Sequence, residues 1–218
     1  MKNITFELYN VHQHGSSFYD YLALRKQFFV DTLKWQIPHN ADVEMDQYDN
    51  PMARYSLVLD DDGRVLAGSR AMSTAATWGD HTYMLKDAIT GKLSSIPSNL
   101  LDEVIDSPKV WECTRLVISP EVKSMRARTQ CLDLIVEGLI DVANAEGANT
   151  LISLSNLWLL CALERLGYGA ELMGDPTTTM VTNMQSWRLQ RVTRRRPDWR
   201  RPRKPPTLGV LGRPRWTF

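Results

Sequence analysis

The stretch Val110-Trp-Glu-Cys-Thr-Arg-Leu-Val-Ile118 has the composition of a strand in the middle of a sheet, because apolar residues recur along its whole length. Two charged residues, Glu112 and Arg115, lie inside it. A buried charge is costly unless it is paired or lines a site. Their separation puts the two side chains on opposite faces of a regular strand, so they need not pair with each other. The stretch therefore predicts a central strand whose two charged residues are either paired with other residues or line a site.

The elements upstream of this stretch begin with a hairpin. Residues 53–59 and 64–72 are strand-like and flank Asp60-Asp61-Asp62-Gly63, which is a strong hairpin turn, and Arg70 falls near the end of the second strand. The other elements expected upstream are a strand over residues 3–8, an amphipathic helix with an aromatic face over 18–34, and short helices over 84–88 and 99–105.

Downstream, a basic loop at residues 119–129 leads into a helix of about 18 residues with one apolar stripe. The further elements expected are a buried strand over residues 150–155, a helix over 157–166 that ends at Gly167, and strands over 168–173 and 178–184. Hairpins thus come early and crossover helices late. This order predicts an α/β fold with a mixed, mostly antiparallel sheet flanked by helices, rather than a doubly wound parallel sheet.

The net charge of +1 hides two oppositely charged parts of the chain. Residues 1–187 hold 15 Lys and Arg against 24 Asp and Glu, a net charge of −9, whereas residues 188–218 hold 11 against 1, a net charge of +10. The second part also contains five prolines and has no periodic apolar face. We therefore expect one folded domain over residues 1–187 and a disordered, Arg/Pro-rich tail over 188–218.

Cysteine and histidine usage gives no metal-binding pattern. Cys113, Cys131 and Cys161 are widely spaced, form no CxxC pair, and are expected to be buried thiols. No run reaches the roughly 18 apolar residues of a membrane-spanning helix. Residues 1–7 lack the apolar core of a signal peptide and include an acidic residue, Glu7. Residence in the cytoplasm, away from membranes, is the expectation.

The segment Val43-Glu-Met-Asp-Gln-Tyr-Asp-Asn-Pro51, called the acidic segment below, crowds three carboxylates next to an Asn-Pro turn. Such crowding is destabilising unless the acids are solvated or faced by arginines or by a cationic ligand. By itself the segment is typical of an exposed acidic loop. Three arginines in the elements around it, Arg25, Arg70 and Arg115, favour a binding site instead.

The order of these motifs resembles that of the acyl-homoserine-lactone synthases, the LuxI-type autoinducer synthases that make quorum-sensing signals. The motifs are Leu24-Arg-Lys-Gln-Phe-Phe-Val30 with Trp35, Glu44-Met-Asp-Gln-Tyr-Asp49, Gly68-Ser-Arg70 and Trp111-Glu-Cys-Thr-Arg115. Each motif alone is weak, but their common order over residues 18–115 is specific. The resemblance fades beyond residue 184.

The resemblance implies an enzyme with a fold related to the GNAT N-acyltransferases. It implies that the amine of S-adenosylmethionine attacks an acyl thioester carried by acyl carrier protein or coenzyme A, which forms an amide. The methionine carboxylate then attacks its own γ-carbon, closes the lactone and expels methylthioadenosine (MTA). No metal or cofactor is implied, because S-adenosylmethionine is itself a substrate.

Binding of this substrate calls for carboxylates and aromatic faces, because S-adenosylmethionine carries a sulfonium and an ammonium group. The arginines would hold the carboxylates ionised and in place. The residues implied in substrate binding are Arg25, Phe29, Trp35, Asp49, Arg70, Thr114 and Arg115. Glu44 is expected to be peripheral to the site.

The attacking ammonium must first lose a proton, so the reaction needs a base. Glu112 is the first candidate for this catalytic role, directly or through a water, and Asp46 is the second.

The acyl chain is expected to lie between the central strand and the later elements. Thr114, Ser153 and Ser155 are candidate polar groups for a 3-oxo or 3-hydroxy substituent, although each could equally be a strand residue satisfied by its neighbours. Arg126 and Arg128, beside a predicted helix N-terminus, would meet the phosphate of a phosphopantetheine arm or the acidic carrier protein, with a solvated basic turn as the alternative.

Two other functions compete with this interpretation. An ordinary GNAT acetyltransferase would need a glycine-rich pyrophosphate loop after the central strand, and residues 124–129 contain no glycine. A nucleic-acid-binding protein could act through arginines and tryptophans of the tail. We favour a charge-rich tail without a specific partner, or one produced by a changed reading frame, so nucleic acid is not expected as a partner.

Overall fold

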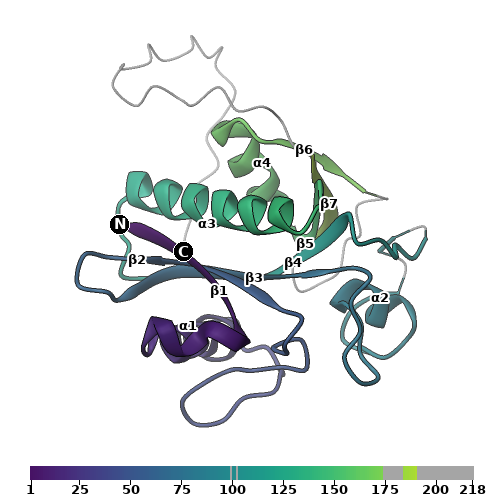
Figure 1. Cartoon of the computed structure of the whole chain (residues 1–218), viewed down its shortest axis with the longest axis horizontal. Helices are drawn as coiled ribbons and strands as arrows, with labels where there is room; N and C mark the ends of the chain where they lie inside the picture. The colour runs from purple at the N-terminus through teal and green to yellow at the C-terminus, as the bar shows by residue number, and fades with distance from the viewer. Residues whose placement is uncertain (99, 102, 174–183, 191–218) are drawn as a thin grey trace.

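The computed structural model describes residues 1–98, 100, 101, 103–173 and 184–190, and in this part of the chain seven strands form one sheet. The strands are β1 (Lys2–Glu7), β2 (Arg54–Leu59), β3 (Val65–Ser73), β4 (Val110–Ile118), β5 (Thr150–Asn156), β6 (Gly169–Leu172) and β7 (Met184–Gln190). Their order across the sheet is β1-β2-β3-β4-β5-β7-β6, so the predicted central strand is central. Among these seven strands, only β4 and β5 pair in parallel. The mixed, mostly antiparallel sheet is therefore confirmed (Figure 1).

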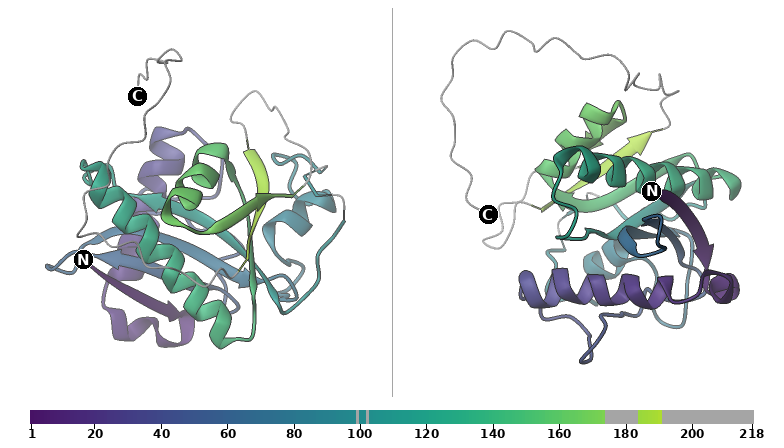
Figure 2. Two further views of the ribbon diagram at one scale, coloured as in Figure 1. Left: turned by 90° about the horizontal axis from the view of Figure 1, so that it is seen from above. Right: turned by 90° about the vertical axis from the view of Figure 1, so that its left-hand side faces the viewer.

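Helices lie on both faces of this sheet (Figures 1 and 2). α3 (Met125–Ala145) and α4 (Leu157–Leu166) cover one face, called the α3 face below. α1 (Ser17–Arg25) covers the opposite face, called the α1 face. The shorter helical segments are η1 (Leu8–His14) and α2 (Met84–Ile89). The sheet therefore separates two layers, as expected for a sandwich.

The helix predicted over residues 18–34 exists, but its second half has wider turns. α1 continues directly into a π-helix, η2 (Lys26–Thr32), after which the N–H of Leu33 donates to the carbonyl of Phe28. Lys34 then adopts a left-handed φ of 58°. Such wider turns often occur at functional sites. Here the π-helix begins immediately after Arg25 and carries Phe29.

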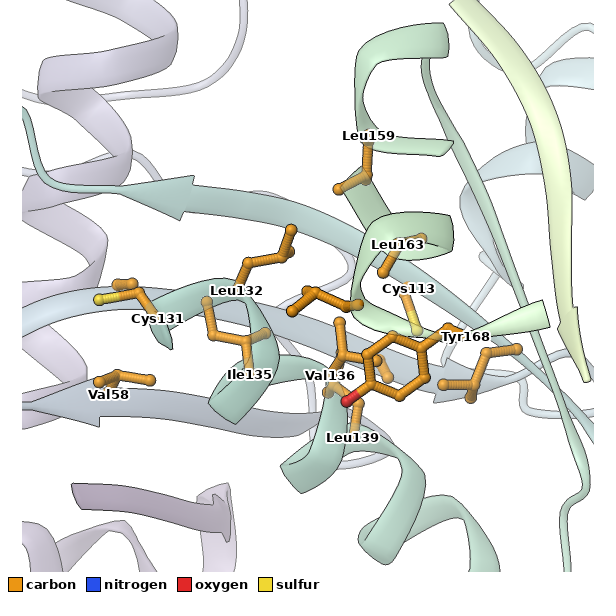
Figure 3. Packing of buried hydrophobic residues seen from close by; sticks show 14 of the residues in the cluster. Val58, Cys113, Cys131, Leu132, Ile135, Val136, Leu139, Leu159, Leu163 and Tyr168 are labelled. Carbon is orange, nitrogen blue, oxygen red and sulfur yellow. The ribbon is translucent and has the colours of Figure 1, made fainter. Parts of the chain in front are cut away.

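The core of the α3 face consists of apolar side chains from α3, α4 and the sheet (Figure 3). Leu132, Ile135, Val136 and Leu139 project from α3 into this core and are at most 5% exposed, in the spacing that the sequence predicts. The hydroxyl of Ser124 caps the helix by accepting a backbone N–H of its first turn. This packing holds α3, which connects the parallel strands β4 and β5, against the sheet.

Two predictions about local structure are wrong. The described residues of the stretch 99–105, namely 100, 101 and 103–105, form bends and loop rather than a helix. Cys161 is exposed, whereas Cys113 and Cys131 are buried. The reason is helical geometry: the buried stripe of α4 runs through Leu159 and Leu163, and position 161 lies between them on the outer side.

The C-terminal strand differs in position from the prediction. β7 pairs with β5 and β6 and ends at Gln190, three residues beyond the expected domain boundary at 187. Of the strand predicted over 178–184, only Met184 lies among the described residues, and the tail beyond Gln190 lies outside them. In the described part of the chain, no helix is both long and apolar enough to cross a membrane.

Candidate active site

The acidic segment folds into tight turns around its own carboxylates. The Asp46 carboxylate accepts the backbone N–H of Tyr48, and the Asp49 carboxylate accepts the backbone N–H of Asp46, both at 2.9 Å. Aspartates form such turns readily, because the short side chain reaches an N–H two or three residues away. The turns aim the remaining carboxylate oxygens away from the segment and toward the arginines around it.

Three arginines from three different elements contact these carboxylates. Arg25, in the last turn of α1, holds Asp49 with two N–H···O bonds of 2.8 and 2.9 Å. Arg70, on β3, holds Asp46 in the same way at 2.6 and 3.2 Å and also lies 2.8 Å from Asp49. Arg115, on β4, lies 2.7 Å from Asp46. The structure thus brings together five residues that the sequence motifs single out.

Glu44 is the third carboxylate of this network, so the expectation that it is peripheral is wrong. Its side chain is 0% exposed, and its oxygens lie 2.6 Å from Nε of Arg25 and 3.3 Å from Nε of Arg115. Its backbone N–H also donates to the carbonyl of Leu22 in α1. With Glu44 included, three carboxylates face three guanidinium groups, and the buried charges balance.

The balance matters because each of these charges is removed from water. Arg25, Arg70 and Asp49 are at most 5% exposed, and an unpaired charge at such depth costs several kcal/mol. Burial by itself raises the pKa of Asp46 and of Asp49, but the neighbouring arginines outweigh it and hold both pKa values below the usual range. Both aspartates are therefore ionised and saturated with donors, which makes Asp46 a weak proton acceptor.

A bulge in β4 explains how Arg115 reaches the network. Gly68 of β3 pairs with Val117, but Arg70 pairs with Thr114, so β4 contains one extra residue at this point. Arg115 has a φ of 56°, in the left-handed region that residues with a side chain rarely adopt. The expectation that Glu112 and Arg115 face opposite sides is therefore wrong, because the bulge turns Arg115 to the α1 face.

Tyr21 of α1 supports this bulge. Its hydroxyl donates a 2.8 Å hydrogen bond to the carbonyl of Arg115, and its ring is 0% exposed. The ring fits only because residue 68 is glycine: a Cβ there would lie 2.7 Å from a ring carbon of Tyr21 and 2.4 Å from Leu57. A close approach of this kind is a common reason for glycine inside a strand.

Phe29 and Trp35 form an aromatic pair next to Arg115. Their ring centroids lie 5.0 Å apart, and the Arg115 guanidinium carbon lies 5.4 Å from the centroid of Phe29. Phe29 is buried and Trp35 is half-buried. The pair thus places aromatic faces beside the charge network, as expected for a site that receives a cationic substrate.

Glu112 lies on the same face of the sheet, in contact with α2. Its two carboxylate oxygens accept the backbone N–H groups of Met84 and Leu85, each at 2.8 Å. Burial raises the pKa of Glu112 to about 7, although both N–H donors and Arg70 act to lower it. A carboxyl with a pKa near neutrality is suited to general base catalysis, whereas Asp46 is not.

A small cavity lies on the opposite side of the sheet, where β4 and β5 part. The two strands pair only from Val110 with Thr150 to Glu112 with Ile152, and they diverge after these residues. The residues lining the cavity are Ser69, Cys113, Leu116, Val136, Leu139, Leu151, Ser153, Leu159 and Leu163. Its wall is therefore almost entirely apolar, with two serine hydroxyls.

The polar residues predicted for an acyl site are separated by the sheet. Ser153 lines the cavity and is 6% exposed, and its hydroxyl has no hydrogen-bond partner among the described residues. Thr114 instead lies on the α1 face, where its hydroxyl accepts a 3.2 Å hydrogen bond from Arg70. Ser155 is half-buried and does not line the cavity.

The two arginines at the start of α3, Arg126 and Arg128, differ in whether they are available to a partner. Arg128 donates to the carbonyls of Ser119 and Val122, both at 3.3 Å, and so braces the loop before the helix. Arg126 is exposed, as is Lys123. Arg126 is thus accessible to an anionic partner, and Arg128 is already engaged within the loop.

This protein has the N-acyltransferase fold. Its mixed sheet parts between two parallel strands, with charged residues on one face and an apolar cavity on the other. A structure assigned as an N-acetyltransferase from Lactobacillus plantarum aligns with a TM-score of 0.52 at 13% identity, over 87% of this chain and 99% of that one. TofI, in a ternary complex with an inhibitor and MTA, aligns with a TM-score of 0.68 at 22% identity, over 87% of this chain and 91% of that one.

The chain belongs to the autoinducer synthase family, whose model matches residues 9–195. It is 28% identical over 163 residues to the acyl-homoserine-lactone synthase of Acinetobacter nosocomialis, which covers 72% of this chain and 82% of the relative. It is 26% identical over 156 residues to that of Rhizobium etli, over 70% of this chain and 67% of the relative. The predicted family and enzyme class, acyl-homoserine-lactone synthase, are confirmed, and the ordinary acetyltransferase is not the function.

Sequence reasoning missed several residues of the site. Charge counting could have found Glu44, because three arginines and only two aspartates leave a positive charge unbalanced in a buried site. Tyr21 and Tyr55 resemble ordinary core residues in sequence. In the structure, the Tyr21 hydroxyl donates to the carbonyl of Arg115, and the Tyr55 hydroxyl donates to Asp49 at 3.1 Å. Only the folded arrangement gives them a polar role.

Proposed function

We propose that this acyl-homoserine-lactone synthase forms its amide bond where β4 and β5 part, with Glu112 as the base and the cavity as the acyl site. The observation that carries the proposal is the position of two neighbouring residues. Glu112 is the last residue of β4 that pairs with β5 and faces the charge network. Cys113 is the first residue after the pairing ends and lines the cavity on the α3 face.

The charge network binds and orients S-adenosylmethionine. Asp46 and Asp49 are fully occupied by arginines, so they act mainly by holding Arg70 and Arg115 in place. Phe29 and Trp35 offer aromatic faces to the sulfonium beside the network. This assignment gives the arginines a positioning role and the aromatic pair the direct contact.

The amide-forming step requires one proton acceptor. The ammonium of S-adenosylmethionine gives a proton to Glu112, and the neutral amine attacks the thioester carbonyl. A C–N bond forms, the C–S bond breaks, and the thiolate of the carrier leaves and takes the second proton that the attacking nitrogen loses. Each Glu112 oxygen accepts one N–H from α2 and keeps a second lone pair for the substrate proton.

Lactone closure then needs no further base. The substrate carboxylate oxygen attacks the γ-carbon as the C–S bond to the sulfonium breaks, and the electron pair of that bond neutralises sulfur in the departing MTA. The arginines can orient the attacking carboxylate for this displacement.

The acyl donor is a thioester of acyl carrier protein or of coenzyme A, and the exposed Arg126 favours the acidic carrier protein. Among structural neighbours, BjaI is described as coenzyme A-dependent and was solved with SAM and isopentyl-CoA, with a TM-score of 0.67 at 17% identity over 85% of this chain and 81% of that one. Such a likeness concerns the fold, so the donor of this chain has to be measured.

The test is to incubate the purified full chain with S-adenosylmethionine and matched acyl-carrier-protein and coenzyme A thioesters, and to quantify lactone and MTA by mass spectrometry. Equal amounts of both products are expected. Arg126→Glu should raise KM for the carrier-protein donor only, and Lys109→Glu, an exposed residue before β4 at the opposite end of that strand from the start of α3, serves as the control. The absence of lactone with every donor, from folded protein, would contradict the function.

A further inference from the structure

Asp87 is a buried carboxylate that the proposed reaction does not use. It lies in the first turn of α2 and is 0% exposed. It accepts hydrogen bonds from the hydroxyls of Tyr48 (3.0 Å) and Thr82 (2.8 Å), and it lies 3.1 Å from Nδ1 of His81 and 3.5 Å from the ammonium of Lys92. Burial raises its pKa, but these donors outweigh burial and lower it. Asp87 is therefore an ionised group held by several donors.

The helix that carries Asp87 also holds the candidate base. The N–H groups of Met84 and Leu85, the first two residues of α2, donate to the two oxygens of Glu112 at 2.8 Å each. α2 has only six residues, so its first residues and Asp87 move as one unit. Any displacement at Asp87 therefore changes the hydrogen bonds of Glu112.

Tyr48 connects Asp87 to the charge network. It lies in the acidic segment between Asp46 and Asp49 and donates its backbone N–H to Asp46. The Arg70 guanidinium carbon lies 5.6 Å from the centroid of its ring. One carboxylate on α2 thus joins the segment that forms the substrate site to the helix that holds the base.

We propose that Asp87 is a positioning residue of the synthase reaction, which locks α2 between Glu112 and Tyr48 so that the base and the Asp46–Arg70 pair keep one relative position. The inference rests on the proposed role of Glu112 as the base. It differs from a purely structural role because it links Asp87 to the protonation of Glu112.

This link gives a readout in the pH profile. The charged and titratable groups around Glu112 are Arg70 and Asp46 on the network side, Tyr48 and Tyr83 near α2, and the Cys113 thiol next to it on β4. The N–H donors of α2 stabilise the ionised form of Glu112, so their loss raises its pKa. The acid limb of kcat/KM then moves to higher pH. A smaller folded fraction, measured at each pH, would scale the rate and leave the pKa of Glu112 in the folded protein unchanged.

The experiment compares Asp87→Asn and Tyr48→Phe with wild type in the full chain. Asp106→Asn is the matched control, because it removes an exposed ion pair with Lys86 on the same helix. Two quantities are measured: the pH profile of kcat/KM with S-adenosylmethionine varied, and hydrogen exchange of the Met84 and Leu85 amides, corrected for global stability.

For Asp87→Asn we expect the acid limb to move up by about one pH unit and the two amides to exchange at least about tenfold faster. For Tyr48→Phe, which removes only the phenolic hydroxyl, we expect KM for S-adenosylmethionine to rise about fivefold with an unmoved limb. The control should match wild type in both measurements.

Unchanged exchange and an unmoved limb in folded Asp87→Asn would overturn the proposal. If that variant does not fold, unchanged KM in Tyr48→Phe overturns it. A wild-type chain that makes no lactone would defeat the proposed function, whereas the exchange of the two amides would still report whether Asp87 holds α2 against Glu112.

Discussion

The guanidinium of Arg115 lies 2.7 Å from the carboxylate of Asp46. Regular strand alternation would place Arg115 on the opposite face of the sheet. The β4 bulge makes this contact, and Tyr21 and Gly68 make the bulge possible. The position of a residue that carries charge in the site thus depends on a backbone irregularity supported by α1. Several measurements follow from this arrangement.

Glu44→Gln should destabilise the protein by about 3–5 kcal/mol, because it leaves the three arginines of the buried network facing only two carboxylates. Glu7→Gln is the matched control: Glu7 pairs with Arg54 at 3.0 Å, but both side chains are more than 20% exposed, so its loss should cost less than about 1 kcal/mol. Denaturant unfolding of both variants measures the difference. Equal and small losses would show that Glu44 is peripheral after all.

Gly68→Ala should destabilise the protein by about 1–3 kcal/mol, because the new methyl group would overlap Leu57 and the Tyr21 ring. It should also reduce kcat/KM more strongly than stability explains, since a displaced Tyr21 releases the bulge that aims Arg115. Tyr21→Phe removes only the hydroxyl and should cost about 1 kcal/mol. Wild-type kcat/KM in a folded Gly68→Ala variant would refute the dependence on the bulge.

The base assignment predicts a pH dependence of activity. With a Glu112 pKa of about 7, kcat/KM should fall about tenfold per pH unit below neutrality, because only the ionised carboxylate accepts the proton. Glu112→Gln should lose product almost completely while remaining folded. A profile that is flat from pH 5 to 8 would exclude Glu112 as the base.

The same group predicts a pH dependence of stability with a defined sign. The pKa of Glu112 is higher in the folded state, about 7, than its ordinary value of 4.5, so the folded state binds the proton more tightly. The stabilisation that this tighter proton binding gives the folded state is therefore fully present below pH 4.5. It is lost as pH rises through 7, at up to about 1.4 kcal/mol per pH unit. Wild type should lose stability relative to Glu112→Gln over this range. A constant difference between them would contradict the raised pKa.

The cavity predicts which residues set acyl specificity. Leu163→Ala, at a fully buried position of the cavity wall, should shift the preferred donor to longer chains and cost about 2–5 kcal/mol of stability. Ser153→Ala should reduce the preference for 3-oxo over unsubstituted donors. Leu157→Ala, exposed on the same helix, is the control and should change neither. Competition between mixed donors, analysed by mass spectrometry, gives the ratios.

By itself the sequence determined the central strand, the hairpin before it and the crossover helix after it, because apolar periodicity and turn chemistry act over a few neighbouring residues. The order of the family's motifs, rather than local chemistry, singled out Arg25, Asp46, Asp49, Arg70 and Arg115 as candidate site residues. The same local rules could not place the short helix at residues 84–88 against Glu112 or give Asp87 a role.

Tertiary structure alone decided which charges meet and which face each side chain occupies. Glu44 pairs with Arg25 and Arg115, which are 19 and 71 residues away in sequence, and only folding brings them together. Strand alternation predicts faces correctly only in a regular strand, so a one-residue bulge reversed the prediction for Arg115. The relative faces of Thr114 and Ser153 depend on the register between β4 and β5, which pairs Glu112 with Ile152 and which the sequence did not reveal.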